Sequence, residues 1–329
     1  MNFFAVLLAL LCEQLKPLRH GNRVHQSVIN WVRWTGRNFD AGGEHHAAIV
    51  WVITVLLPGL LVALLYWGLR HFSVLLALLL DLVVLYLTLG FRQFSHYFTD
   101  IRDALERGDD ATARQLLAEW RHLDASELPR TELIRHVVEH SLLAAHRHVF
   151  GVFFWFVVCS TLGLGPAGAV VYRMAEFASR YWAFKSRTLD APTNPRLLAL
   201  SRQAFVWIDH VPARLTATGF AIVGNFEEAV NAWRRDARLW LHPNEGIILA
   251  SAAGAVGLQL GGAAAPGITP DRSKTFEAGT EPDATGAAGS TAGAPPQLAH
   301  LQSVVGLVWR SVVLWMLLLA LLTLANLVG

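Results

Sequence analysis

The histidines and glutamates of residues 131–148 are the first groups in this chain whose spacing fits a chemical task. His136 and His140 are four residues apart, so a helix places them on one face, with Glu132 and Glu139 beside them. Two histidines one helical turn apart can share a metal ion, but no spacing fixes a third ligand. The same groups fit a polar helix face near lipid headgroups, or donors for a phosphate. We therefore predict no metal site and no cofactor.

Further polar groups follow in the second half of the chain. Glu176 and Arg180 are four residues apart in the orientation that favours an ion pair on a helix. Arg214 lies beside an apolar stretch, where a guanidinium needs a carboxylate, carbonyl groups or a phosphate as its partner. Asn244 and Gly246 either form a turn before a helix or present backbone amides to an anion.

Several common mechanisms have no support in the sequence. There is no phosphate-binding P-loop, no G-x-G-x-x-G, no H-E-x-x-H and no paired cysteine motif. The two cysteines, Cys12 and Cys159, lie in apolar segments and are expected to be buried side chains. A net charge of +2 without a basic run gives no reason to expect nucleic acid as a partner.

Long apolar segments must position these groups. The chain is 53% hydrophobic and only 16% charged, against about 25% charged in soluble proteins, which indicates an integral membrane protein. Four segments are long and apolar enough to be read as membrane spans: 47–69, 72–91, 149–171 and 304–328. Residues 3–12 form an apolar helix that is too short to span alone.

The flanks of the first two spans set the orientation. Arg70 and His71 form the turn of a helical hairpin, so residues 13–46 and 92–148 lie on the same side. Both flanks are rich in arginine, and the positive-inside rule places them in the cytoplasm. The predicted fold is all-α, a polytopic helical membrane protein with a cytoplasmic helical insert. The predicted location is a membrane that the chain crosses several times.

Residues 197–298 contain weaker signals. Residues 197–223 are expected to form either two helix halves or a shallow re-entrant pair. Residues 247–265, rich in Ala and Gly, are expected to form a closely packed helix. Residues 266–298 have the composition of a flexible linker with nothing that can pack. The expected division is into N-terminal membrane helices (1–91), the insert (92–148), central membrane and interfacial helices (149–265), the linker (266–298) and a C-terminal span (299–329).

Several segments together resemble one family. FRQFSHYFTDIRDALERGDDATARQLL resembles its "LR-x-L…AL-x-x-GD…AR-x-LL" pattern, and GPAGAVVYR resembles "PGALAYR". WIDHVPARLTA resembles "W-I-PARLTA", and WLHPNEGIILASAAGAVGLQLGG resembles "SPNAGW…AAAAGALGVQLGG". Because these segments occur in the same order, the chain resembles the CobD/CbiB cobalamin-biosynthesis membrane family, and more closely its AmpE-like branch, which is linked to β-lactamase regulation.

The resemblance implies a helical, multi-pass protein of the bacterial inner membrane. In the family's enzymes it implies an amide-forming step that joins adenosylcobyric acid to an aminopropanol unit. Two departures stand against that chemistry. The family's E-N-x-x-D-G falls on Leu143, Ala144, Ala145, Arg147 and His148, and its N-T-L-D-S falls on Glu176, Phe177, Ala178, Ser179 and Arg180. The acidic groups that a reaction on a carboxylate needs are therefore missing at those positions.

These departures favour a divergent, AmpE-like family member that binds or senses a ligand without the synthase chemistry. The residues expected to line its ligand site are Asp124, Glu139, Arg173, Arg214 and Asn244, and no catalytic residue is identified. The expected partners are the lipid bilayer and a phosphate-bearing or corrinoid small molecule. The alternative is an adenosylcobinamide-phosphate synthase, whose amide-forming step belongs to cobalamin biosynthesis.

Overall fold

The chain is helical wherever its structure is described. The computed structural model describes residues 2–15, 23–39, 44–121, 124–186, 193–262 and 289–328. Over these residues every regular element is a helix, and the only β-type pairing is two isolated bridges. The all-α prediction is therefore confirmed.

Three described helical stretches are long and apolar enough to cross a bilayer. They are His46–Phe72, Arg130–Thr161 and Leu298–Ala325. Two shorter apolar helices, Phe3–Glu13 and Val74–Thr88, fall below the usual spanning length of about 20 residues. Multiple crossings and the cytoplasmic side of 92–148 stay predictions.

The helices pack into two compact units. The first unit contains described residues of 1–90 and 147–209, and the second unit contains described residues of 91–146, 210–262 and 289–328. The expected insert 92–148 thus packs with later helices of the chain. The two units describe which helices pack together and not which segments lie in the membrane. The division of the sequence into five segments therefore stays a prediction.

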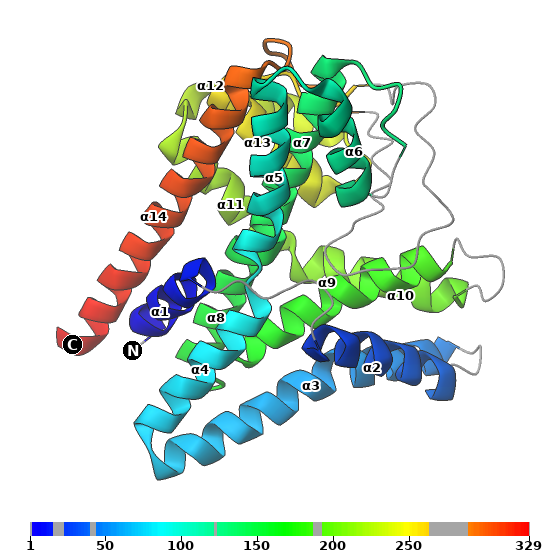
Figure 1. Cartoon of the computed structure of the whole chain (residues 1–329). Coiled ribbons are helices and arrows are strands. Elements are labelled where there is room, and N and C mark those ends of the chain that lie inside the picture. The colour runs from blue at the N-terminus through cyan, green and yellow to red at the C-terminus, as the bar shows by residue number, and fades with distance from the viewer. Residues whose placement is uncertain are drawn as a thin grey trace. The chain divides into compact units, whose positions relative to one another are not determined.

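The first unit is organised around α9 (Figure 1). Its helices are α1 (Asn2–Leu15), α2 (Arg23–Phe39), α3 (Glu44–Phe72), α4 (Val74–Thr88), α8 (Gly151–Thr161), α9 (Ala167–Lys185) and α10 (Pro195–Ile208). Helix α9 packs against α3, α8 and α10. Its buried side chains Met174, Phe177 and Trp182 form one core cluster with Val32 of α2 and Val50 of α3.

The first hairpin differs from the expected pair of spans. Ser73 ends the turn, and its side chain accepts a hydrogen bond from the Leu75 amide, so α4 begins at Val74. The backbone becomes extended at Leu89, so α4 has only 15 residues and not the span expected over 72–91. Asp81 within α4 is 5% exposed and therefore faces the protein interior.

The expected span over 149–171 is wrong as a continuous helix. Helix α8 ends at Thr161, and α9 begins at Ala167 after a turn containing Gly163 and Gly165. Both glycines have positive φ, which ends a helix at little cost because glycine lacks a Cβ. Gly168 then lets α9 approach α8 closely, since a Cβ there would lie 2.2 Å from the Trp155 carbonyl oxygen. An apolar run therefore forms two packed helices.

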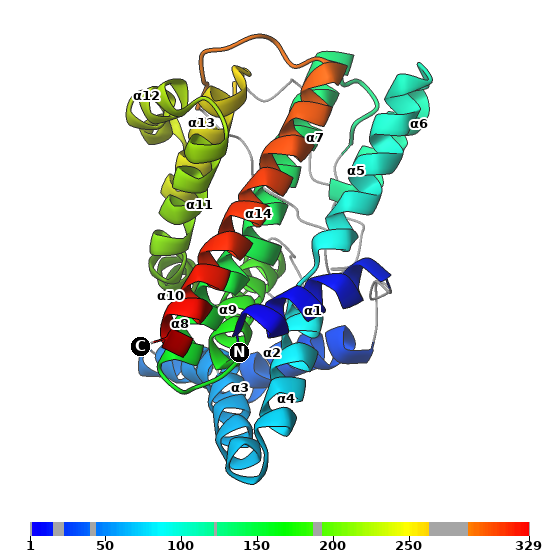
Figure 2. The ribbon, with the colours of Figure 1, turned by 90° about the vertical axis from the view of Figure 1, so that its left-hand side faces the viewer.

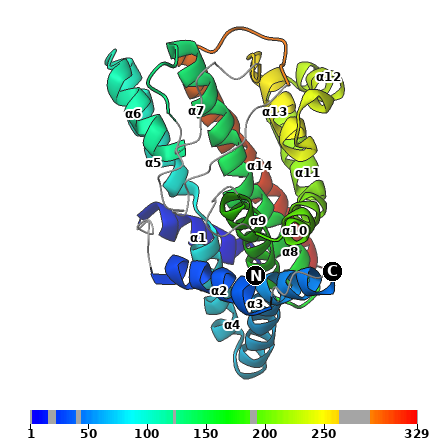
Figure 3. The ribbon, with the colours of Figure 1, turned by 90° about the vertical axis from the view of Figure 1, so that its right-hand side faces the viewer.

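In the second unit α14 runs along α7, with α5 and α6 on one side and α11 to α13 on the other (Figures 2 and 3). The helices are α5 (Phe91–Glu106), α6 (Asp110–Arg121), α7 (Arg130–Ala145), α11 (His210–Val223), α12 (Phe226–Asp236), η2 (Ala237–Leu239), α13 (Pro243–Val256) and α14 (Leu298–Val328). A π-helical turn, His146–Phe150, continues the chain from α7 to α8. Residues 197–223 form two helices, α10 and α11, as predicted.

Local contacts explain where α6 begins, and the structure also defines the start of α13. The Asp109 carboxylate accepts a hydrogen bond from the Thr112 amide at the start of α6, and bonding to Thr112 lowers the pKa of Asp109. A lowered carboxyl pKa adds stability near neutral pH that is lost as the pH falls through it. Helix α13 starts at Pro243, so Asn244 and Gly246 lie in its first turn and not in a preceding loop.

The segment after α13 pairs with the segment before α14. The Gln259 amide donates to the Ala294 carbonyl at 2.8 Å, and the Thr291 amide donates to the Leu260 carbonyl at 2.8 Å. Thr291 is 2% exposed. The expected linker 266–298 is described only from Gly289, and there it is packed because its backbone groups are hydrogen-bonded in this pairing. Residues 266–288 lie outside the described residues.

Two glycines with the same backbone conformation provide a test of this pairing. Gly257 and Gly261 have φ of 75° and 76°, but a Cβ at Gly261 would lie 1.9 Å from the Gly289 carbonyl oxygen, whereas one at Gly257 meets nothing within 4 Å. Gly257→Ala should cost about 1 kcal/mol for the left-handed backbone. Gly261→Ala should cost about 1–3 kcal/mol more for the overlap. Thermal unfolding of the two purified variants measures the difference, and equal unfolding temperatures would contradict the pairing.

Candidate functional site

The expected site residues are divided between the two units. Asp124, Glu139, Arg214 and Asn244 belong to the second unit, and Arg173 belongs to the first. Of these, the structure brings Arg214 next to the start of α13, because Arg214 and Pro243 line one pocket. The contacts of each residue show what it does locally.

Asp124 stabilises a turn. It is exposed, and its carboxylate accepts hydrogen bonds from the amide of Ser126 at 3.0 Å and from the Ser126 hydroxyl at 2.7 Å. An aspartate that bonds the residue two positions later is a common turn device. Its predicted role in a ligand site stays a prediction.

Glu139 joins α7 to the chain after α13. Its side chain is 2% exposed, and Oε1 accepts a hydrogen bond from the Gly261 amide at 2.7 Å. Arg135, one turn earlier, donates to the Gly261 carbonyl at 2.5 Å and also pairs with Glu132. The Arg135 and Glu139 charges lie 3.8 Å apart, so each offsets the cost of burying the other. Both backbone polar groups of Gly261 are thereby bound to α7.

The histidine pair of α7 is engaged by other side chains. His136 Nδ1 lies 2.9 Å from Arg121 Nη1, and because arginine is always a donor, Nδ1 must be the acceptor. The His140 ring meets the Trp120 ring edge to face, with centroids 4.4 Å apart. Among the described residues, no group of three or more His, Cys, Asp or Glu side chains could hold a metal ion. The interpretation of α7 as a polar helix near headgroups is not supported, since both rings are buried.

Arg173 takes part in an ion-pair network on α9. The Glu176 carboxylate is 1% exposed and accepts from Arg173 Nη1 at 2.9 Å and from Arg180 Nη2 at 3.1 Å. The predicted pair between Glu176 and Arg180 is confirmed, and Arg173 adds a second guanidinium. One turn away, the Tyr172 hydroxyl donates to Asp209 at 2.9 Å. The Glu176 carboxylate therefore has two cationic partners on its own helix, Arg173 and Arg180.

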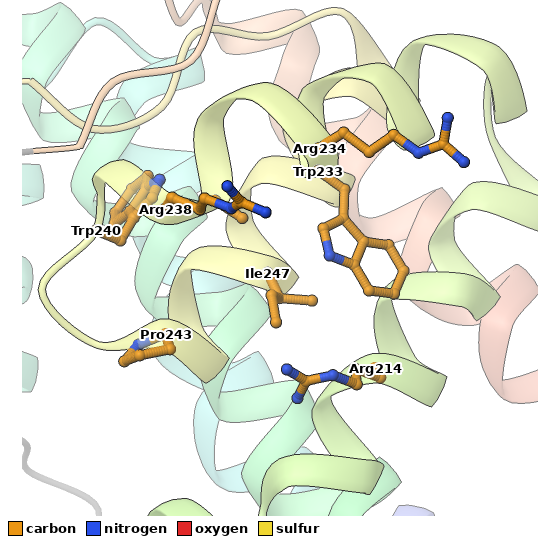
Figure 4. Close-up of a pocket in the computed structure, with 8 residues that line it drawn as sticks. Arg214, Trp233, Arg234, Arg238, Trp240, Pro243 and Ile247 are labelled. Carbon is orange, nitrogen blue, oxygen red and sulfur yellow. The ribbon is translucent and has the colours of Figure 1, made fainter.

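Arg214 lines a pocket of about 730 Å³ in the second unit, which we call the arginine pocket. The residues lining it come from α11, α12, η2 and α13: Arg214, Trp233, Arg234, Ala237, Arg238, Trp240, Pro243 and Ile247. Figure 4 shows the guanidinium groups of Arg214 and Arg238 on opposite sides of Ile247, with the Trp233 ring beside them. Arg234 extends away from these groups. The volume is in the usual range for small-ligand sites.

The pocket includes functional candidates that the sequence reasoning missed. Arg234 and Arg238 are four residues apart, which places them on one side of a helix, and each has a tryptophan next to it or two residues away. This spacing of arginines and tryptophans was the sequence signal that could have identified the two arginines as candidates. What the sequence lacked was any sign that this segment folds against Arg214, 20 residues earlier. Asn244 is buried in the first turn of α13 and does not line the pocket.

The role of Glu139 can be tested by substitution. Glu139→Ala leaves the buried Arg135 charge and the Gly261 amide without this acceptor, so the free energy of unfolding should fall by about 3 kcal/mol. Glu139→Gln keeps an acceptor and should cost less. Glu119, exposed on α6, provides the control, and Glu119→Gln should change little. Denaturant unfolding in detergent, followed by circular dichroism, measures all three. If Glu139→Ala is as stable as the parent, the carboxylate is not a structural anchor.

Comparison with known proteins identifies the family. The family model described as CobD/Cbib protein matches residues 2–288. The cobalamin biosynthesis protein CobD of Stutzerimonas stutzeri is 30% identical over 278 residues, which cover 84% of this chain and 82% of that protein. The protein of the same name from Chromobacterium violaceum is 33% identical over 201 residues, 60% of each chain. No solved structure shows a significant match. This chain belongs to the CobD/CbiB family.

Proposed function

We propose that this protein acts in cobalamin biosynthesis as an adenosylcobinamide-phosphate synthase, which joins adenosylcobyric acid to an aminopropanol unit. The observation that carries the proposal is the similarity over 84% of the chain to a protein named for cobalamin biosynthesis. The names of the two relatives do not support an AmpE-like regulatory protein, because both relatives are called cobalamin biosynthesis protein CobD.

The geometry is compatible with a substrate that carries negative charge. Among the residues that the structure describes, the lining of the arginine pocket has three arginines and no acidic side chain. The carboxylates Glu139 and Glu176 are buried beside arginine partners, which offset part of the cost of burying them. Glu176 occupies a position where the resemblance aligns the family's N-T-L-D-S. We propose it as a replacement for the carboxylate missing from that motif.

A second candidate function is binding or sensing without synthesis, at the inner membrane. This function is favoured by the residues of this chain that stand where the family's E-N-x-x-D-G motif is expected. Leu143, Ala144 and Ala145 stand there, and they are at most 3% exposed, so this part of α7 is apolar core. Side chains of this kind cannot transfer protons or bind metal ions.

Complementation of a bacterial strain that lacks the synthase separates the two functions. We expect the full-length chain to restore growth on adenosylcobyric acid under conditions that require cobinamide phosphate, and mass spectrometry of extracts to show that product. The empty vector and a Glu176→Gln variant, each compared at equal protein level in membranes, are the controls, and Glu176→Gln should reduce product by at least tenfold. Absence of growth while the protein is present and folded in the membrane would reject the synthase and support the second candidate.

A further inference from the structure

One end of the first unit carries exposed charges of a single sign. The helices α2, α9 and α10 contain one acidic side chain, Glu176, which is 1% exposed and bound by Arg173 and Arg180. The exposed charged side chains that the structure describes on these helices are all arginines, and we call them the basic end: Arg33, Arg37, Arg196 and Arg202. No exposed carboxylate on the three helices offsets this charge, so the surface attracts anions.

The three helices form one packed layer. Val32 of α2, Trp182 of α9 and Leu197 of α10 are at most 1% exposed and belong to one buried cluster, which also contains Val50 of α3. Helix α3 contacts all three helices, and in Figure 1 they lie together on the side where α3 begins. The arginines of the basic end are therefore carried by helices whose positions are set by a shared core.

Helix α2 turns a polar face outward. Its exposed residues recur within one half of the helix circumference: Val24, Gln26, Ser27, Asn30, Arg33, Trp34, Arg37 and Asn38. Toward α3, Trp31 Nε1 donates to the Thr54 carbonyl at 3.2 Å, and the hydroxyl groups of Thr35 and Thr54 lie 2.7 Å apart. These contacts fix α2 along α3 in the orientation that leaves its arginines exposed.

An exposed tryptophan lies among these arginines. Trp34 is 48% exposed and stacks on Trp31, with ring centroids 5.4 Å apart. Arg33 and Arg37 form no ion pair with a carboxylate of the residues that the structure describes, and Arg33 Nε donates to the Tyr181 hydroxyl at 3.5 Å. Tryptophan beside arginine at the start of an apolar helix is typical of the headgroup region of a bilayer.

The position of α2 along α3 fits such a region. Helix α3 contains the candidate span His46–Phe72, and α2 contacts it at Thr54. Beyond this level the aliphatic side chains Leu56, Leu60 and Leu64 are 40% to 57% exposed. Residues 56–72 rise about 26 Å along a helix axis, close to the hydrocarbon thickness of about 30 Å. The basic end therefore lies at one border of an apolar surface that is long enough for the bilayer core.

We propose that the basic end rests on anionic lipid headgroups of the bilayer around α3. Basic side chains next to a membrane helix attract acidic lipids, and guanidinium groups donate paired hydrogen bonds to phosphate oxygens. The sequence from 14 to 39 contains no aspartate or glutamate, so the charge complementarity extends beyond the exposed arginines. The exposed leucines of α3 favour lipid over a soluble acidic protein, because they need apolar cover directly beside the charges. The proposal concerns membrane contact and does not rest on the synthase activity.

Lipid selectivity provides the first test. The full-length chain is placed in phosphatidylcholine vesicles that contain a trace of spin-labelled lipid. Electron paramagnetic resonance then compares the association of spin-labelled phosphatidylglycerol and spin-labelled phosphatidylcholine with the protein. We expect phosphatidylglycerol to be favoured about fourfold at low salt, because several basic groups attract it. This preference should fall in about 0.5 M salt, where the Debye length is about 4 Å.

Matched arginine variants assign the selectivity to the basic end. Arg37→Gln and Arg202→Gln should each reduce the preference for phosphatidylglycerol to about twofold, and the double variant should bring it close to one. Both side chains are exposed, so the variants should fold. Arg107→Gln is the control, because Arg107 is equally exposed but stands between the exposed acids Glu106 and Asp109. It should leave the preference unchanged.

A depth measurement tests the placement of α2 directly. A nitroxide is attached at Asn30→Cys, an exposed position of α2, in a chain that also carries Cys12→Ser and Cys159→Ser. Power saturation with dissolved oxygen and with a water-soluble nickel chelate gives the depth of the label, calibrated by lipids labelled in the headgroup. We expect the label at residue 30 to lie at headgroup level.

The combined results decide the proposal. Preference for phosphatidylglycerol that depends on Arg37 and Arg202, with the label at headgroup level, supports lipid contact. Equal association of the two lipids, an equal loss in Arg107→Gln, or a label as accessible to nickel as in water rejects it. Binding of soluble polyglutamate through the same arginines, with residue 30 in water, also rejects it and assigns the surface to an acidic protein. None of these results alters the outcome of the complementation experiment, which tests the synthase separately.

Discussion

The contact on which the second unit most depends joins Glu139 of α7 to the backbone of Gly261. Gly261 has both of its backbone polar groups bound to α7, and its amide is held by a carboxylate that is almost completely buried. A buried charge of this kind is costly to leave without a partner, so the position of the chain after α13 is fixed relative to α7. The segment from Gly289 then pairs with this fixed chain and leads into α14.

Close approach of backbones is the second constraint. A Cβ at Gly254 would lie 2.3 Å from the Glu228 carbonyl oxygen, so α13 touches the backbone of α12. A Cβ at Gly246 would lie 2.5 Å from the Ala237 carbonyl oxygen, so α13 also touches the backbone of η2. Small residues let helices meet without an intervening layer of side chains. The arginine pocket exists because α11, η2 and α13 are brought together in this way around Ile247.

Both carboxylates considered as site residues are surrounded by arginine. Glu176 has two arginines on its own helix, and Glu139 has Arg135 one turn away. Buried charge of both signs inside helices of an apolar protein needs a reason, because such groups are expensive to keep away from water. Leu143, Ala144 and Ala145 are buried apolar side chains of the same protein.

The sequence by itself determined the helical class, most helix positions and the pair Glu176–Arg180. These follow from contacts within about four residues, which helix geometry sets without help from the rest of the chain. The tertiary structure decided which distant groups meet. Glu139 and the Gly261 amide are 122 residues apart, and nothing local indicates their contact. The break between α8 and α9 has a different cause, because Gly163, Gly165 and Pro166 form a local turn signal that the apolar run around them outweighed in the prediction of one span over 149–171. The arginine pocket likewise depends on how the consecutive elements α11, α12, η2 and α13 pack against one another, and the close contacts at Gly246 and Gly254 are not apparent from a linear pattern.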